Sequence, residues 1–159
     1  LLLKAIEDLL TAMRPDESEH RVEVLVTRAS VEQARYVCDK FAFVRWNAMA
    51  KTLRIHARRL PPSPALLVSP EDPADHQAAK GQTPSTPPAR VAVISAGTTD
   101  APVAEEASET LAWMQVSHYR ITDVGVAGPY RLIPHLSSLR NCCAIVVIAG
   151  MEGALPSVV

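Results

Sequence analysis

The sequence lacks a disulfide framework. It contains only three cysteines, Cys38, Cys142 and Cys143. An odd number with two adjacent members is a poor basis for disulfide pairing. Neighbouring residues on a strand also point to opposite faces, so the adjacent pair does not form a metal clip. We therefore expect reduced, structural thiols and a reducing, cytoplasmic location.

The sequence also lacks a basic excess and a long apolar run. Its formal net charge is −1, which gives no sign of a nucleic-acid partner. No apolar run reaches the roughly 18 residues of a membrane span, and the apolar start at residues 1–3 is too short for a secretory signal. The histidines show no ligand spacing, so we predict no metal site, and nothing in the sequence indicates Mg²⁺. They are His20, His56, His76, His118 and His135.

Residues 1–56 predict a small N-terminal α/β domain. Apolar spacing predicts a helix over residues 1–13, and alternation predicts a strand over 22–26. Ser30 and Gln33 form a capping box for a helix over 31–40, with Ala34, Val37, Cys38 and Phe41 inward. Two short strands are expected over 42–46 and 51–56. Residues 57–90 hold eight of the 13 prolines and predict a linker.

Residues 91–159 predict the start of a parallel α/β sheet. Val91–Ser95, His118–Val124 and Ala144–Ala149 have the pattern of strands, the first and third buried. The helix after Asp100 would carry an apolar stripe of Val103, Ala107, Leu111 and Met114. The helix Tyr130–Leu139 would bury Leu132, Ile133, Leu136 and Leu139, and Ala154–Val159 would begin another helix. This β-α-β-α-β order predicts an open parallel sheet in three layers, incomplete within this chain.

A glycine-bearing loop follows each predicted strand. Such loops gather at the carboxyl edge of the sheet, where open α/β sheets bind ligands. The first loop then places an anion site at Thr98, Thr99 and Asp100, beside a helix N-terminus. The alternatives are that Asp100 only caps the helix and that the glycines only permit tight turns. The first loop is not GxGxxG, which disfavours an ordinary dinucleotide-binding redox domain.

Three segments carry a family resemblance. ISAGTTDAPVAEEA (residues 94–107), DVGVAGPYRL (123–132) and VVIAGMEGALPSVV (146–159) resemble LarB, the nickel-pincer cofactor biosynthesis family within the PurE, or AIR carboxylase, superfamily. EVLVTRASVEQARYV (23–37) resembles the small domain that precedes the carboxylase domain in LarB. The resemblance therefore implies a PurE/flavodoxin-like fold and favours LarB over PurE.

The resemblance implies a carboxylase. LarB-like enzymes carboxylate the pyridinium ring of nicotinic acid adenine dinucleotide, with carbon dioxide or bicarbonate as co-substrate, and hydrolyse its phosphoanhydride. The alternative is a PurE-like aminoimidazole ribonucleotide carboxylase of purine nucleotide biosynthesis. No tightly bound cofactor is expected, and the complete protein is expected to be a homo-oligomer.

The implied site residues lie in the three loops. Gly97, Thr98 and Thr99 would bind phosphate, and Asp100 would accept from ribose hydroxyls or polarise the substrate. Glu152 would act in acid/base chemistry or ring positioning. The remaining predicted binding residues are Gly125, Gly128, Gly150, Gly153 and Arg131, the last as a bidentate anchor for phosphate or carboxylate.

The chain departs from the family pattern in two respects. Tyr130 stands where the family usually has histidine, and a phenol titrating near 10 shuttles protons poorly at neutral pH. LarB also uses a nucleophilic cysteine downstream of the MEGALP stretch, beyond residue 159. These departures favour a further alternative, a truncated and catalytically inactive nucleotide-binding module. An open apolar sheet edge also predicts self-association.

Overall fold

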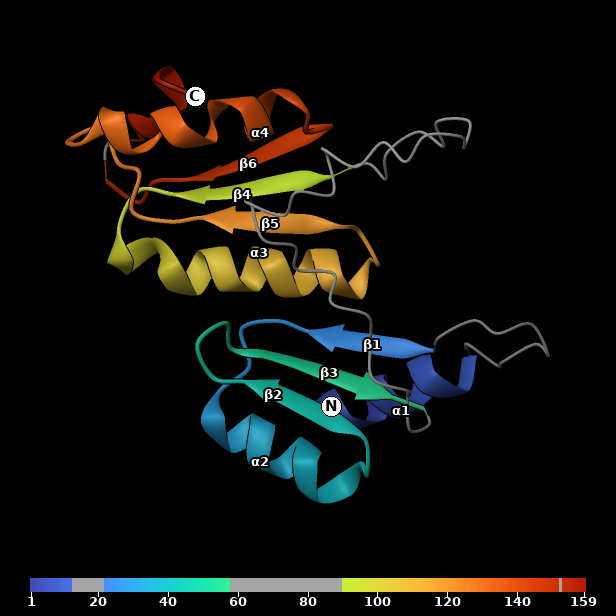
Figure 1. The fold of residues 1–159 in the computed structure, drawn as a ribbon. Helices are drawn as coiled ribbons and strands as arrows, with labels where there is room; N and C mark the ends of the chain where they lie inside the picture. The colour runs from blue at the N-terminus through green and yellow to red at the C-terminus, as the bar shows by residue number, and fades with distance from the viewer. Residues whose placement is uncertain (13–21, 58–89, 152) are drawn as a thin grey trace, which may run out of the picture. The chain divides into compact units, whose positions relative to one another are not determined.

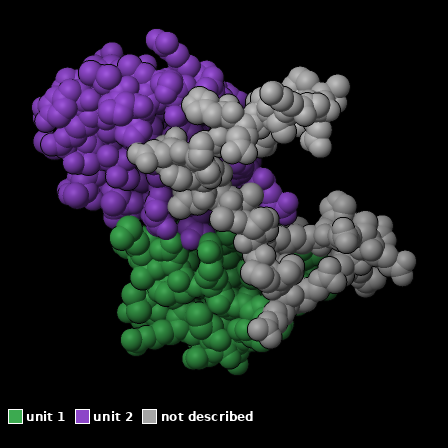
Figure 2. Space-filling view, in the orientation of Figure 1, with its two compact units in different colours: residues 1–64 green, residues 65–159 purple. Residues whose placement is uncertain are grey.

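The computed structural model describes residues 1–12, 22–57, 90–151 and 153–159. The chain divides into two compact units, residues 1–64 and 65–159 (Figure 2). Apart from its two end residues, the predicted linker at 57–90 lies outside the described residues. Both units combine helices with a three-stranded sheet, which confirms the α/β class (Figure 1).

The first unit has two helices and an antiparallel sheet. Its elements are α1 (Leu2–Ala12), β1 (Glu23–Val26), α2 (Val31–Lys40), β2 (Val44–Asn47) and β3 (Thr52–His56). The strand order is β1-β3-β2, and Ile55 pairs with Val24 on one side and Val44 on the other. The capping box at Ser30 forms as predicted, with Ser30 N donating to Gln33 Oε1 over 2.8 Å.

The core of the first unit follows the predicted alternation. One face of the sheet contributes Val24, Leu53 and Ile55, and the helices add Ile6 and Val37. On the opposite face of β1 and β3, Glu23 forms an ion pair with Arg54. The expectation that Cys38 points inward was wrong, because its side chain is exposed. Ala34 and Val37 already form the buried edge of α2, and the next residue is rotated about 100° away from it.

The second unit contains the parallel sheet. Its strands are β4 (Val91–Ser95), β5 (His118–Ile121) and β6 (Ala144–Ile148), in the order β5-β4-β6. Helix α3 (Ala101–Trp113) joins the first two strands, and a segment ending in α4 (Leu136–Arg140) joins the last two. The chain leaves the central strand β4 for one side and then crosses to the other, so α3 and α4 cover opposite faces (Figure 1).

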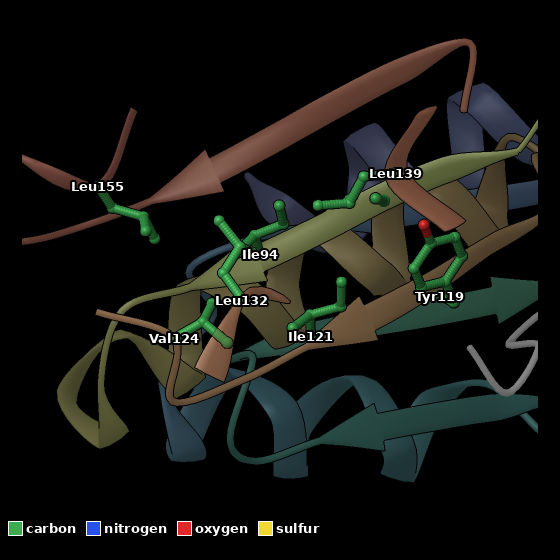
Figure 3. Close-up of a cluster of buried hydrophobic side chains, with 8 residues drawn as sticks. Ile94, Tyr119, Ile121, Val124, Leu132, Leu139 and Leu155 are labelled. Atoms are coloured by element: carbon green, nitrogen blue, oxygen red, sulfur yellow. The ribbon is translucent and has the colours of Figure 1, made fainter. Parts of the chain in front are cut away.

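The core of this unit lies between the sheet and the α4 segment. Ile94, Ile121 and Val124 line the sheet side, and Leu132 and Leu139 lie against them (Figure 3). Strand β4 is buried along its whole length, as its continuous apolar run predicts. On the other face, α3 packs mainly against β4 and β5.

Several predicted details of this unit were wrong. The segment 130–139 is not one helix but two 3₁₀ turns, Pro129–Arg131 and Ile133–His135, followed by α4. Pro134 has no N–H to continue a helical ladder, which explains the break. Ile133 and Leu136 are consequently exposed, while Leu132 and Leu139 are buried. The expected final helix is only the 3₁₀ turn Leu155–Ser157.

The apolar surfaces of α3, β5 and β6 also differ from expectation. On α3, Ala104 and Ser108 are buried, whereas Val103 and Met114 of the predicted stripe are exposed. Strand β5 ends at Ile121 because the chain soon enters the left-handed region at Asp123. Strand β6 is largely exposed rather than buried, since α3 lies over the other two strands and no described strand pairs with its outer edge.

Candidate functional site at the carboxyl edge of the parallel sheet

The three loops after the parallel strands meet at one edge of the sheet. The first loop (residues 96–100) touches the end of β6, where Ala96 N donates to Ile148 O over 3.0 Å. It also touches the second loop (122–128), where Gly125 N donates to Ala96 O over 3.1 Å. The strand order puts the first loop and the third loop (149–151 and 153) on either side of the point where the connections change direction. In open α/β sheets this switch point is where ligands bind.

Asp100 ties the first loop to the third. Its carboxylate accepts hydrogen bonds from Gly97 N at 2.9 Å and from Gly150 N at 2.8 Å, and only 6% of the residue is exposed. The prediction that Asp100 caps α3 was wrong, because its side chain makes no capping bond to that helix. A 3₁₀ turn over Thr98–Asp100 precedes α3, and Asp100 is the third residue of that turn. Its carboxylate therefore reaches back to the backbone N–H of Gly97, which precedes the turn. Asp100 therefore holds the first and third loops together, and each of its carboxylate oxygens accepts a backbone hydrogen bond.

Thr98 and Thr99 form the outer surface of the first loop. Both are exposed, and they begin the turn that leads into α3. Within the described part of the chain, neither backbone N–H has a hydrogen-bond partner. Unpaired N–H groups at the start of a helix, together with the helix dipole, attract an anion. The arrangement can hold a phosphate group through two amides and two hydroxyls.

Two loop glycines are required by close approach. A Cβ at Gly150 would lie 2.9 Å from Asp100 Oδ1, and a Cβ at Gly125 would lie 2.9 Å from Ala96 O. The first glycine therefore permits the bond to Asp100, and the second permits the contact between loops. Gly97 differs from them, because its backbone is extended and a Cβ there would meet open space.

Arg131 lies in the second connection, one turn beyond Gly128. Its Nη1 donates to Asp123 Oδ2 over 2.6 Å and to Asp123 O over 3.2 Å. Gly128 is buried beside this side chain, with a would-be Cβ 3.2 Å from Arg131 Nε. Tyr130 is 65% exposed, and its ring centroid is 6.0 Å from the guanidinium carbon. Hydrogen bonding to Tyr130, followed by the charge of Asp123, raises the pKa of Arg131.

Asp123 also belongs to the site, although the sequence pattern predicted it to lie inside a strand. The strand ends two residues earlier. The sequence signal that could have identified Asp123 is its position as an acidic residue directly before a glycine-bearing loop, in the segment DVGVAG (residues 123–128). Glu152 lies outside the described residues; of the glycines beside it, Gly150 binds Asp100 and Gly153 has a φ of +65°.

The described residues contain no group of three or more histidine, cysteine or acidic side chains that could hold a metal ion. The two adjacent thiols lie away from the loops: Cys142 Sγ is 3.1 Å from Tyr119 Oη, and Cys143 Sγ bonds to Arg90 O. Burial, and then the contact with Cys142, raise the pKa of Tyr119 well above its usual value. In the described ranges, no helix is long and apolar enough to cross a membrane.

This geometry defines an α/β unit with the exposed loop of Thr98 and Thr99 at the carboxyl edge of its parallel sheet. The sequence matches no established protein family. It is similar to an uncharacterized protein, MJ0165, of Methanocaldococcus jannaschii, with 51% identity over 72 residues. The match covers 44% of this chain and 28% of that protein, so the chain spans less than a third of the relative's length.

Proposed function

We propose that the second unit forms the phosphate-binding part of a LarB-like carboxylase domain of the AIR carboxylase superfamily. Its substrate would be nicotinic acid adenine dinucleotide. Carboxylation replaces a ring hydrogen with a carboxylate. With carbon dioxide the hydrogen is released as a proton, and with bicarbonate that proton combines with the departing hydroxide to form water. Hydrolysis of the phosphoanhydride consumes one water and releases AMP. The activity of the whole protein is part of this proposal, because the chain spans 28% of the relative that it matches.

One observation carries the proposal: Asp100 joins the first and third loops and leaves Thr98 and Thr99 facing solvent at the switch point. The buried carboxylate fixes the two loops relative to each other. The unpaired amides of the threonines are then held in place before a ligand arrives. Such preorganisation lowers the cost of binding a phosphate.

The other site residues have consistent roles. Arg131 supplies a permanent positive charge at the second loop, suited to a phosphate or a carboxylate. Asp100 supports the site by positioning, because its two oxygens already accept backbone hydrogen bonds. Glu152 stays the proposed acid/base group. Tyr130, which replaces the family's histidine, is exposed beside Arg131 and favours binding over proton transfer.

Calorimetric titration of the chain tests this function. Nicotinic acid adenine dinucleotide and aminoimidazole ribonucleotide are compared as ligands, and mass spectrometry with bicarbonate present follows carboxylation. We expect the dinucleotide to bind and Thr98→Val with Thr99→Val to weaken its binding about a hundredfold or more, since each of the two lost hydrogen bonds to a charged group is worth about 1.5–3 kcal/mol. Ser137→Ala, an exposed hydroxyl on α4, is the matched control.

The outcomes separate the candidate functions. Tighter binding of aminoimidazole ribonucleotide would favour the PurE-like reaction. Binding of the dinucleotide without any carboxylated product would indicate a module that binds and does not catalyse. Binding of neither nucleotide would contradict both the LarB-like and the PurE-like function for this chain.

A further inference from the structure

Asp123 has a strained backbone at the start of the second loop. Its φ is +61°, in the left-handed region that residues with a side chain rarely adopt, although aspartate tolerates it better than most. The next two residues are fixed to the first strand's end, with Val124 N bonded to Ser95 O and Gly125 N bonded to Ala96 O. A strained residue held this firmly at a ligand-binding edge suggests a functional reason for the conformation.

The strained conformation directs Asp123 toward Arg131. Both the backbone carbonyl and the carboxylate of Asp123 accept from Arg131 Nη1. The backbone of Arg131 is itself fixed, because its N–H bonds to Gly128 O and the adjacent Leu132 is 3% exposed in the core. The arginine side chain therefore folds back along the loop to the residue where the loop begins.

Stability does not account for this pair. The side chains of Arg131 and Asp123 are 47% and 65% exposed. Exposed ion pairs contribute little to folding, and their effect is often unmeasurable. Holding a long cation in one place still affects binding, because a free arginine loses rotamer freedom when a ligand immobilises it.

We propose that Asp123 is a positioning residue that holds the Arg131 guanidinium ready for an anionic group of the ligand, a phosphate or a carboxylate. The inference rests on the proposed function. Asp123 occupies only Nη1, and a guanidinium has five N–H donors in a planar fork that matches such an anion. Electrostatics alone predicts the opposite effect, since a carboxylate beside the site repels an anion.

Two substitutions separate positioning from structure. Asp123→Gly removes the carboxylate and relieves the positive φ, so we expect an unchanged or higher melting temperature. We expect it also to raise the Kd of inorganic pyrophosphate roughly two- to tenfold, the range that corresponds to immobilising one flexible side chain. Asp123→Asn keeps an acceptor and tolerates the backbone conformation, so its Kd should stay closer to that of the wild type.

The experiment is calorimetry with pyrophosphate and with nicotinic acid adenine dinucleotide. Arg131→Gln should abolish most binding, and Asp123→Gly should add nothing further in that background, as expected if the two residues act together. Asp39→Asn on α2 and Arg140→Gln on α4 are exposed controls for the charge changes.

Each result decides the inference. Unchanged or tighter pyrophosphate binding by Asp123→Gly overturns it, as does an additive effect with Arg131→Gln. If the dinucleotide binds without dependence on Asp123, the inference fails and the proposed function stands. If pyrophosphate binding depends on Asp123 and neither nucleotide binds, the inference stands and the proposed function fails. Absence of binding by both probes overturns both.

Discussion

Replacing Asp100 with alanine is the most direct test of how the loops are held together. The change removes an acceptor for Gly97 N and Gly150 N, at 2.9 and 2.8 Å. Hydrogen bonds to a charged group contribute about 1.5–3 kcal/mol each. Gly150 is exposed, so water can replace part of its loss. We therefore expect Asp100→Ala to lower the free energy of unfolding of this unit by about 2–4 kcal/mol.

Asp100→Asn should lower the free energy of unfolding by less than Asp100→Ala does. The carboxylate uses one oxygen for each amide, whereas asparagine has one oxygen and one NH₂ group. Whichever way the side chain turns, one backbone N–H then faces another donor. We expect a loss of about 1–2 kcal/mol, near half of the alanine effect.

Tryptophan fluorescence during urea unfolding measures these losses. The chain has two tryptophans, Trp46 on β2 and Trp113 at the end of α3. In a Trp46→Phe background, the signal comes from the unit that contains Asp100. Arg140→Ala removes an exposed charge on α4 of the same unit and should change its free energy of unfolding by no more than about 0.5 kcal/mol.

A stability of Asp100→Ala within about 0.5 kcal/mol of the wild type would refute this reasoning. Full retention of stability by Asp100→Asn would also contradict it, since one oxygen cannot accept from two separate amides in the same way. Either result would mean that Asp100 does not hold the first and third loops together.

Four further perturbations have defined outcomes. Ser30→Ala removes the capping box of α2 and should cost about 1 kcal/mol in the first unit, read from Trp46 fluorescence. Gly125→Ala places a Cβ 2.9 Å from a backbone oxygen and should destabilise the second unit by about 1–3 kcal/mol in the same urea assay, read there from Trp113. The pKa of Tyr119 is raised in the folded state. The stability that the folded state gains from protonated Tyr119 is therefore complete below about pH 10 and is lost as the pH rises further. Tyr119→Phe should therefore reduce alkaline unfolding, followed by tryptophan fluorescence at high pH. The exposed strand β6 should cause self-association, which Val146→Lys should reduce in sedimentation velocity; a wild-type chain that stays monomeric at high concentration would contradict this.

Local sequence signals predicted the elements with the strongest patterns. The continuous apolar run Val91–Ser95 became a fully buried strand, and Ser30 with Gln33 formed the expected capping box. The predictions failed where a pattern competes with backbone chemistry. Pro134 interrupts a segment with good helical spacing, and the positive φ at Asp123 ends β5 early. Spacing alone also placed Val103 inward on α3, although Ala104 lies on the buried side.

The β-α-β-α-β order of the second unit, and the gathering of its loops at one edge, follow from the sequence alone, because parallel strands joined by helices end on the same side. The residues of the first loop, Thr98, Thr99 and Asp100, are also identified by the sequence pattern. What those residues contact depends on the folded arrangement of the loops. Asp100 binds Gly150, fifty positions further along the chain, and not the helix beside it. Arg131 turns back to Asp123. Such pairings depend on how distant loops meet at the sheet edge, which no local pattern specifies.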